Sequence, residues 1–391
     1  MADLNSNEIM DIERRHGSGL WNVDIAIVRG EGSRIWDSDG RSYIDCMAGI
    51  AVASLGYGHP RLLQAISEQA ERLMVCTQNL GNDTRAAFLE KLFAIVGPSL
   101  SRAFLCNSGS EANEGALKWA RVATGRSKFV ATKRGFSGRT LGVLGLTWEK
   151  AYREPFGPLG YEAEFVPYND IEALGEAITE DVAAVVLEPI QGEGGIHPAD
   201  NDYLQEAQRL CREHGTLLVA DEIQCGVGRS GSFLALEPSG IQPDIVTLAK
   251  GLGGGFPIGA VLMTDEVAKT MPVGGHGGTF GGNPLACSAA LAVLNEIVES
   301  DLLDHVRRVG QQLSEGLRSI NSDKIRTVRG RGLMIGLQLK IKVAEVISKL
   351  REHGVFAMNA GSTVIRFVPP LTITEAEVDQ VIEAVTAVLS E

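Results

Sequence analysis

The sequence has few cysteines, and their spacing matches neither metal ligands nor a disulfide framework. Six cysteines are scattered singly through 391 residues, and no two of them form a C-x-x-C motif. Single thiols of this kind are typical of reduced cytoplasmic proteins. We therefore expect no disulfide scaffold and no metal site, zinc included. The six are Cys46, Cys76, Cys106, Cys211, Cys225 and Cys287.

Long apolar runs, an export signal and an excess of positive charge are also absent. No run approaches the ~18–20 apolar residues that a membrane-spanning helix needs. The first residues, MADLNSNEIM, lack the basic start and apolar centre of a signal peptide. The net charge of −13 argues against a nucleic-acid partner. We expect a cytoplasmic protein that binds neither membrane nor nucleic acid.

The composition is that of an ordinary globular protein. Hydrophobic residues make up 44% of the chain and charged residues 22%. A length of 391 residues exceeds the size at which a single hydrophobic core usually stops growing. We therefore expect one large domain and one smaller domain.

The middle of the chain alternates short apolar segments with longer helical patterns. Some segments, such as VAAVVLEPI at 182–190, are almost wholly apolar, as strands covered on both faces are. Helical patterns at 110–124 and 202–215 lie between them, and the second ends in a glycine suited to a helix cap. This alternation predicts a mostly parallel α/β sheet within residues 51–284. The other expected strands cover 103–107, 128–132, 216–223, 244–250 and 258–264.

The two ends of the chain predict a second, smaller α+β domain. Residues 28–46 carry an Asp39-Gly40 turn between strand-like runs, which indicates a hairpin. A long helical pattern follows residue 285, and the chain ends in an amphipathic helix that opens with the capping-box sequence T-E-A-E. We expect residues 285–391 to form the small domain, with residues 1–50 packing against it. The expected strands of this domain are VRGRGLMIGLQL and VIRFVPPL.

Three loops follow strands at the edge where parallel α/β sheets bind ligands. Gly109 and Ser110 open a helix, where backbone N–H groups and the helix dipole favour a phosphate, although ordinary helix capping explains them equally well. Asp221 ends an apolar strand and is either a buried acid that keeps a ring nitrogen protonated or a structural acid. Gln224 lies close enough in the sequence to donate to a neighbouring oxygen. Lys250 ends another strand and precedes a glycine-rich run.

The order of that lysine and its glycines excludes two familiar phosphate loops. A Walker-type loop needs its glycines before the lysine, and a G-x-G-x-x-G fingerprint needs the first strand-to-helix turn. TLAKGLGGGFPIGA, at 247–260, satisfies neither. What remains is a lysine that forms a Schiff base with a phosphorylated aldehyde cofactor. The glycines would then let the chain turn away beside that cofactor.

Across almost its whole length the chain resembles the class III (subgroup II) pyridoxal-phosphate (PLP) aminotransferases of fold type I. That resemblance implies a large PLP-binding domain with a mostly parallel sheet, a small α+β domain, and a homodimer with shared active sites. The matching stretches are NSGSEANEGALKWAR, GFSGRTLG, EPIQGEGG, DEIQCGVGR, TLAKGLGGGFPIGA, HGGTFGGNPLA and VIRFVPPL.

The resemblance also implies roles for the residues that bind the cofactor. Lys250 would carry PLP as a Schiff base and shuttle protons, Asp221 would pair with the ring nitrogen, and Gln224 would contact the ring hydroxyl. For Phe136, which would stack on the ring, a plain core position is the alternative. The remaining cofactor ligands would be Gly109 and Ser110 for the phosphate, Phe136 stacking on the ring, and Thr279 for the phosphate of the neighbouring subunit.

Three further residues are implied to bind substrate. Arg139 resembles a ligand for the substrate carboxylate. Glu193 and Arg366 resemble a switch pair in which the acid masks the arginine for the amino donor and releases it for 2-oxoglutarate. A salt bridge within a sheet is the alternative for Arg366.

Two departures from the acetylornithine aminotransferase pattern bear on the substrate. Ser137 and Gly278 are smaller than the usual residues and would open the mouth of the site. GFSGRT is more similar to the branch that acts in lysine and arginine biosynthesis on substrates whose α-amino group is masked by the acidic carrier protein LysW. Lys133, Arg134 and Arg153 would then attract the carrier, although a solvated charged face also explains the adjacent pair.

We therefore expect transfer of the terminal amino group of a masked lysine or ornithine to 2-oxoglutarate, giving the semialdehyde and glutamate. The biosynthetic reaction runs in reverse. N-acetylornithine is the alternative substrate. A PLP mutase or decarboxylase on the same fold, and a nucleotide-binding module that uses the glycine loop, remain open as other classes.

Overall fold

The large unit of the molecule is built on a seven-stranded sheet. The computed structural model describes residues 4–20, 22 and 24–391. The strand order is β4-β12-β11-β10-β7-β5-β6, and every neighbouring pair is parallel except those that involve β12. The strands are β4 (Arg102–Cys106), β5 (Lys128–Thr132), β6 (Ala163–Val166), β7 (Val182–Leu187), β10 (Leu217–Asp221), β11 (Ile245–Leu248) and β12 (Gly259–Met263).

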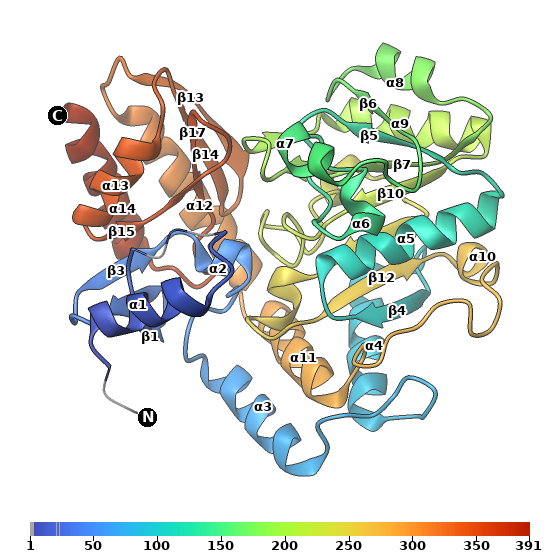
Figure 1. Cartoon of the computed structure of the whole chain (residues 1–391), viewed down its shortest axis with the longest axis horizontal. Helices are drawn as coiled ribbons and strands as arrows, with labels where there is room; N and C mark the ends of the chain where they lie inside the picture. Colours follow the sequence, from blue (N-terminus) through green and yellow to red (C-terminus); the bar gives the residue numbers. More distant parts are fainter. Residues whose placement is uncertain (1–3, 21, 23) are drawn as a thin grey trace.

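Both faces of this sheet are covered, which explains its apolar sequence. All six residues of β7 are buried, and they are divided between two separate hydrophobic clusters. The α/β architecture predicted from the sequence is confirmed, as Figure 1 shows for the layer around α5 and α9. The helices of this unit are α3 (Pro60–Arg72), α4 (Asp83–Val96), α5 (Gly109–Thr124), α6 (Leu141–Leu144), α7 (Lys150–Arg153), α8 (Ile171–Ala177), α9 (Asn201–His214), α10 (Asp265–Ala268) and α11 (Pro284–Glu299).

The predicted strands and helices of the sheet lie close to where the sequence put them. The strand expected at 128–132 is β5, and α9 ends at Gly215, whose φ of 61° fits the left-handed cap. Two features differ from expectation. The edge strand β6 was not predicted, because a run of four residues is too short to be told from a loop by its pattern, and β12 runs antiparallel to both neighbours.

The smaller unit combines both ends of the chain. β13 (Ile325–Arg331), β14 (Met334–Leu339), β17 (Val364–Phe367) and β16 (Met358–Asn359) form an antiparallel sheet in that order. α14 (Glu375–Ser390) begins with the predicted capping box, in which Thr374 and Glu377 bond reciprocally. The other helices are α12 (Leu302–Ser319) and α13 (Ala344–Glu352).

The N-terminal segment is joined to this unit by strand pairing. β3 (Ser42–Asp45) pairs in parallel with β15 (Val355–Phe356), which extends a sheet of β1 (Ile27–Glu31) and β2 (Arg34–Asp37). α1 (Ser6–His16) and α2 (Ala48–Ala51) flank these strands. The boundaries at residues 50 and 284 stay a prediction, and α11 packs on α3 and α4 of the large unit.

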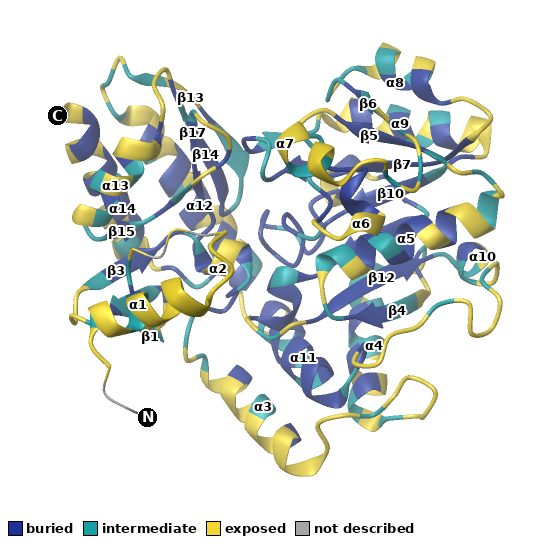
Figure 2. Cartoon of the chain, viewed as in Figure 1, coloured by how far each residue is buried: buried dark blue, intermediate teal, exposed yellow. Residues whose placement is uncertain are grey.

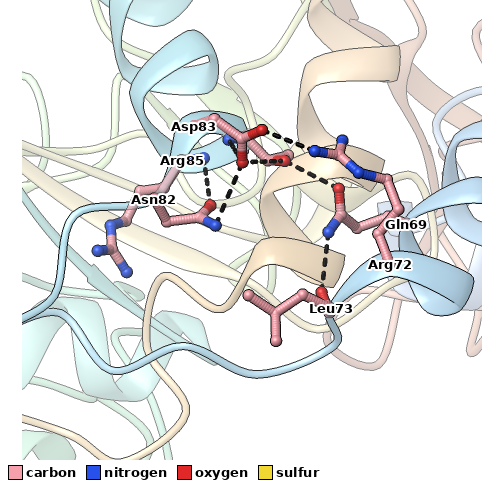
Figure 3. A network of polar contacts seen from close by, with 7 residues as sticks. Gln69, Arg72, Leu73, Asn82, Asp83 and Arg85 are labelled. Carbon is pink, nitrogen blue, oxygen red and sulfur yellow. Dashed lines mark hydrogen bonds and ion pairs between the residues drawn. The ribbon is translucent and has the colours of Figure 1, made fainter.

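An exposed apolar loop joins α3 to α4. Gln69 donates to the carbonyl of Leu73 at 2.8 Å, and Arg72 lies 2.7 Å from Asp83 at the start of α4 (Figure 3). The side chain of Asn82 caps α4. These bonds hold the loop in place even though Figure 2 shows α3 largely exposed. Across the described part of the chain, no helix has both the length and the apolar character to span a membrane.

Candidate active site

The carboxyl edge of the large sheet surrounds a cavity of about 160 Å³, which we call the inner cavity. The loops after β4, β5, β7, β10 and β11 supply its walls. Six of the predicted site residues meet there, so strand order brings together positions up to 141 residues apart in sequence. The lining residues are Ser108, Gly109, Ser110, Phe136, Ser137, Gly138, Glu188, Asp221, Ile223, Gln224 and Lys250.

One end of the inner cavity is built to receive an anion. Gly109 and Ser110 form the first turn of α5, whose N–H groups have no acceptor within the helix. Glycine is needed at two positions here. A Cβ at Gly109 would fall 2.9 Å from Ile223, and one at Gly138, where φ is 140°, would fall 2.5 Å from the hydroxyl of Ser110. These glycines keep the end of the cavity open.

Asp221 lies deep in the inner cavity and is held by Asn113, a residue for which the sequence predicted no role in the site. Nδ2 of Asn113 donates to Oδ2 of Asp221 at 2.7 Å, and the backbone N–H of Ile223 donates to Oδ1 at 3.1 Å. The hydroxyl of Thr247 in turn donates to Oδ1 of Asn113 at 2.8 Å. Burial raises the pKa of Asp221, and the bonds from Asn113 and Ile223 oppose that rise. Asn113 lies one helical turn beyond Gly109, which is the signal that could have revealed it.

Glu188 is a second residue of the inner cavity that was not predicted. Its two oxygens accept from the backbone N–H groups of Phe136 and Gly192, each at 3.0 Å. It therefore ties together two loops that carry predicted site residues. Burial first, and then the charge of Asp221, raise the pKa of Glu188. Its place directly after β7, at the same sheet edge as Asp221, is the sequence signal that was overlooked.

Lys250 enters the inner cavity from a strained backbone position. It follows β11 with a φ of 45°, a conformation that is unusual for a residue with a side chain. Burial lowers the pKa of its amine, which favours the neutral form that acts as a base. The glycines after it do not line the cavity. Gly254, with a φ of 61°, leaves no room for a side chain, because a Cβ there would fall 2.9 Å from Val293 and 3.0 Å from Leu62.

A second cavity of about 370 Å³, which we call the outer cavity, adjoins the inner one and shares Phe136 with it. Glu193 lines it and lies 2.7 Å from Arg366 of β17, so the predicted pair does meet, across the two units. Arg366 is fully buried, and the same Nη1 donates to Oε1 of Gln224 at 3.0 Å. The other lining residues are Arg134, Gly135, Thr147, Trp148, Glu149, Tyr152, Gly194, Asn359 and Gly361.

Four predicted site residues lie outside both sets of lining residues: Arg366, described above, and Arg139, Gly278 and Thr279. The guanidinium of Arg139 stacks on the ring of Tyr152, 3.5 Å from its centroid, at the edge of the outer cavity. Gly278 and Thr279 are exposed on the loop between α10 and α11. A Cβ at Gly278 would meet no atom of this chain, so its own protomer does not require glycine there.

Comparisons with known proteins agree with this architecture. The model of the family described as aminotransferase class-III matches residues 18–389. The chain is 48% identical to a [LysW]-aminoadipate semialdehyde transaminase of Deinococcus radiodurans, covering 99% of this chain and 91% of that protein. It is 44% identical to an acetylornithine aminotransferase of Caldanaerobacter subterraneus, covering 94% and 95%.

A solved structure shows the same likeness in three dimensions. The ornithine aminotransferase of Toxoplasma gondii, described with PLP at its active site, superposes with a TM-score of 0.94. It is 34% identical and covers 98% of this chain and 94% of its own. The family match, the relatives and the fold agree, and the chain belongs to the class-III aminotransferase family.

Proposed function

We propose that this aminotransferase binds PLP in the inner cavity and moves the terminal amino group of an N-α-masked lysine or ornithine to 2-oxoglutarate. The observation that carries the proposal is the convergence of an anion-binding helix start, a buried acid and a buried lysine on one cavity. The names of the relatives support the substrate class, and the PLP-bound structural neighbour supports the cofactor.

The residues of the inner cavity fit PLP end to end. The first turn of α5 suits the phosphate, and the openings kept by Gly109 and Gly138 leave room for it. Asp221 would hold the proton of the ring nitrogen, Phe136 would cover a ring face, and Lys250 would bind the aldehyde carbon covalently. When bound, PLP supplies an electron sink for the carbon that loses its proton.

The chain's own side chains supply the acid–base steps. Lys250 would be the base of the inner cavity, placed to take a proton from the substrate carbon and to give it back. Its lowered pKa keeps part of the amine neutral for that task. Asp221, held by Asn113, would keep the ring nitrogen protonated.

Glu193 and Arg366 would let one site accept two different substrates. While Glu193 and Arg366 are paired at 2.7 Å, the charge of the buried guanidinium is neutralised. The apolar chain of the amino donor can then lie beside it. When Glu193 moves toward the outer cavity, Arg366 offers a fork of donors to the distal carboxylate of 2-oxoglutarate. Arg139 would hold the other carboxylate from the mouth.

A carrier-bound substrate is favoured by unpaired positive charge on Arg134, which lines the outer cavity, and on three cations next to its lining residues. Among the described residues, no carboxylate forms an ion pair with Lys133, Arg134, Arg139 or Arg153. In a chain of net charge −13, such a cluster is suited to an acidic partner such as LysW. Glu149 is the exposed acid among them. N-acetylornithine, the substrate in the name of a relative at 44% identity, is the alternative.

We also infer a cytoplasmic homodimer with shared sites. Large apolar side chains are exposed on α3, on the loop held by the bonds of Figure 3, and on the loop that carries Thr279, which suits contact with a second copy. Thr279 would then reach the neighbouring phosphate. Analytical ultracentrifugation of the loaded protein should give a dimer. The exposed residues are Leu63, Leu73, Met74, Val75, Leu80, Val273 and Phe280.

The half-reaction with glutamate tests the proposed chemistry. Mixing the purified yellow protein with glutamate should bleach the visible band and release one 2-oxoglutarate per subunit. A mutase would release no free oxo acid, a decarboxylase would release CO₂, and a nucleotide-binding module would be colourless. Lys250→Ala should lose the band of the resting enzyme. Retention of the same band by that variant would overturn the role of Lys250.

A further inference from the structure

Gln224 lies between the switch pair and the inner cavity. Its side chain is buried and lines the inner cavity, while Arg366 is fully buried behind it and Glu193 lines the outer cavity. One nitrogen makes both connections. Nη1 of Arg366 donates to Glu193 at 2.7 Å and to Oε1 of Gln224 at 3.0 Å. Gln224 is therefore the side chain that touches both the pair and the cavity.

The orientation of the Gln224 amide follows from chemistry. A guanidinium carries only N–H donors, so the atom that faces Arg366 must be the amide oxygen. The NH₂ group is therefore on the other branch of the amide, available to the cavity that Gln224 lines. The amide is also confined from the side. A Cβ built on Gly192 would fall 2.4 Å from Oε1 and 2.6 Å from Nε2.

An amide in this position makes the cavity sensitive to the charge state of Arg366. An amide whose oxygen accepts from a cation becomes a stronger donor through its nitrogen, because linked hydrogen bonds polarise one another. Glu193 partly neutralises the charge of Arg366 while the two are paired, and the full charge returns when Glu193 moves away. The strength of the N–H donor that faces the cavity must then depend on whether Glu193 is in place.

We propose that Gln224 is a positioning residue that relays the state of the Glu193–Arg366 pair to the cofactor. This inference rests on the proposed function, because it requires PLP in the inner cavity with an oxygen of its ring facing Gln224. With Glu193 away, Gln224 donates more strongly and stabilises negative charge on that oxygen. With Glu193 or a substrate carboxylate on Arg366, the donation weakens. The acceptor of the amino group thereby changes the acidity of the cofactor before any bond is made.

The pH midpoint of the visible absorption band of the loaded enzyme tests the relay. Glu193→Gln leaves Arg366 without its counter-charge, so the midpoint should fall, because the deprotonated form is favoured. Gln224→Met removes the amide, and the same Glu193→Gln change should then shift the midpoint much less. The coupling between the two substitutions should be about 0.5 pH unit or more. Equal shifts in both backgrounds would mean that the charge acts through space, and would overturn the relay.

Two further variants keep the test decisive. Gly192→Ala retains Gln224 and the ion pair but pushes the amide aside, so it should also suppress the coupling. It replaces Gln224→Met if that variant does not bind PLP, and full coupling in Gly192→Ala would contradict the proposal. Glu149→Gln removes another carboxylate of the outer cavity and should leave the midpoint unchanged. A wild-type protein without any visible band would refute the proposed function itself, whereas additive shifts would refute only the relay.

Discussion

Nδ2 of Asn113 lies 2.7 Å from Oδ2 of Asp221, and the same nitrogen donates to the carbonyl of Ser137 at 2.8 Å. One amide group thus fixes the buried acid and the loop that precedes Arg139. The contact joins the start of α5 to the end of β10, two elements that are 108 residues apart in the chain. The two bonds of Asn113 therefore link two parts of the wall of the inner cavity.

Removing this amide should weaken the hold of Asp221 on the proton of the ring nitrogen. A hydrogen bond to a charged group contributes about 1.5–3 kcal/mol, so Asn113→Ala should lower kcat/KM by roughly 10–100-fold. The pKa of Asp221 should rise without its donor, and the acidic limb of the pH–rate profile should move to higher pH. Thr247→Val removes the hydroxyl that donates to Asn113 and that itself lowers the pKa of Asp221 less than Asn113 does, so it should have a smaller effect in the same direction. An unchanged acidic limb in Asn113→Ala would contradict this role.

Glu193→Gln should separate the two half-reactions. Arg366 would stay unmasked, so the half-reaction with 2-oxoglutarate should keep or raise its kcat/KM. The half-reaction with the amine donor should fall by roughly 10–100-fold, because an uncompensated buried cation then faces an apolar chain. Stopped-flow measurement of each half-reaction checks this, with Glu149→Gln as the control. An equal loss in both half-reactions would indicate a merely structural ion pair.

Charge reversal at the mouth should act on a carrier-bound substrate alone. Lys133→Glu combined with Arg134→Glu should lower kcat/KM for the carrier-bound amine at least ~10-fold at low salt, with a loss that shrinks as salt screens the charges. Arg212→Glu, at the end of α9 on the opposite edge of the sheet, is the control. Steady-state rates with N-acetylornithine should not change in either variant. A similar loss for N-acetylornithine would show that the two residues act on the site itself.

Glu222 should make the stability of the protein depend on pH. Burial raises its pKa to about 7, although the N–H groups of Ala235 and Leu236 donate to it. A raised carboxyl pKa means that the folded state holds its proton to higher pH than the unfolded state. The stabilising contribution is therefore complete below about pH 4 and is lost as pH rises through 7. Urea unfolding of the cofactor-free protein at pH 5 and pH 8 should show a smaller decrease for Glu222→Gln than for the wild type. An identical decrease would contradict this sign.

The sequence was most informative where one pattern has one physical cause. The wholly apolar run of β7 indicated a strand covered on both faces, and T-E-A-E indicated the capping box that starts α14. β6 was missed because a run of four residues, three of them apolar, is too short for its pattern to distinguish a strand from a loop. The antiparallel direction of β12 was missed because direction depends on the path of the connecting loop rather than on local composition.

The site shows a similar division. Lys250, Asp221 and Gly109 were predicted because each follows a strand at the ligand-binding edge, and the inner cavity brings them together. Asn113 and Glu188 were missed because their importance lies in the partners they bond, which are distant in sequence. The glycines after Lys250 do not line the inner cavity, and one of them, Gly254, lies against Val293 and Leu62, contacts that sequence spacing does not reveal.

A comparison of substrates that differ in the group masking the α-amino nitrogen tests the proposed function most directly. Values of kcat/KM should be measured for free lysine, N-acetylornithine, N-acetyl-lysine and carrier-bound lysine or ornithine, each with 2-oxoglutarate. The account predicts that the carrier-bound amine is used best, that its advantage declines with salt, and that free lysine is used worst. If the carrier gives no advantage over the acetyl compounds, the assignment to carrier-bound substrates is wrong.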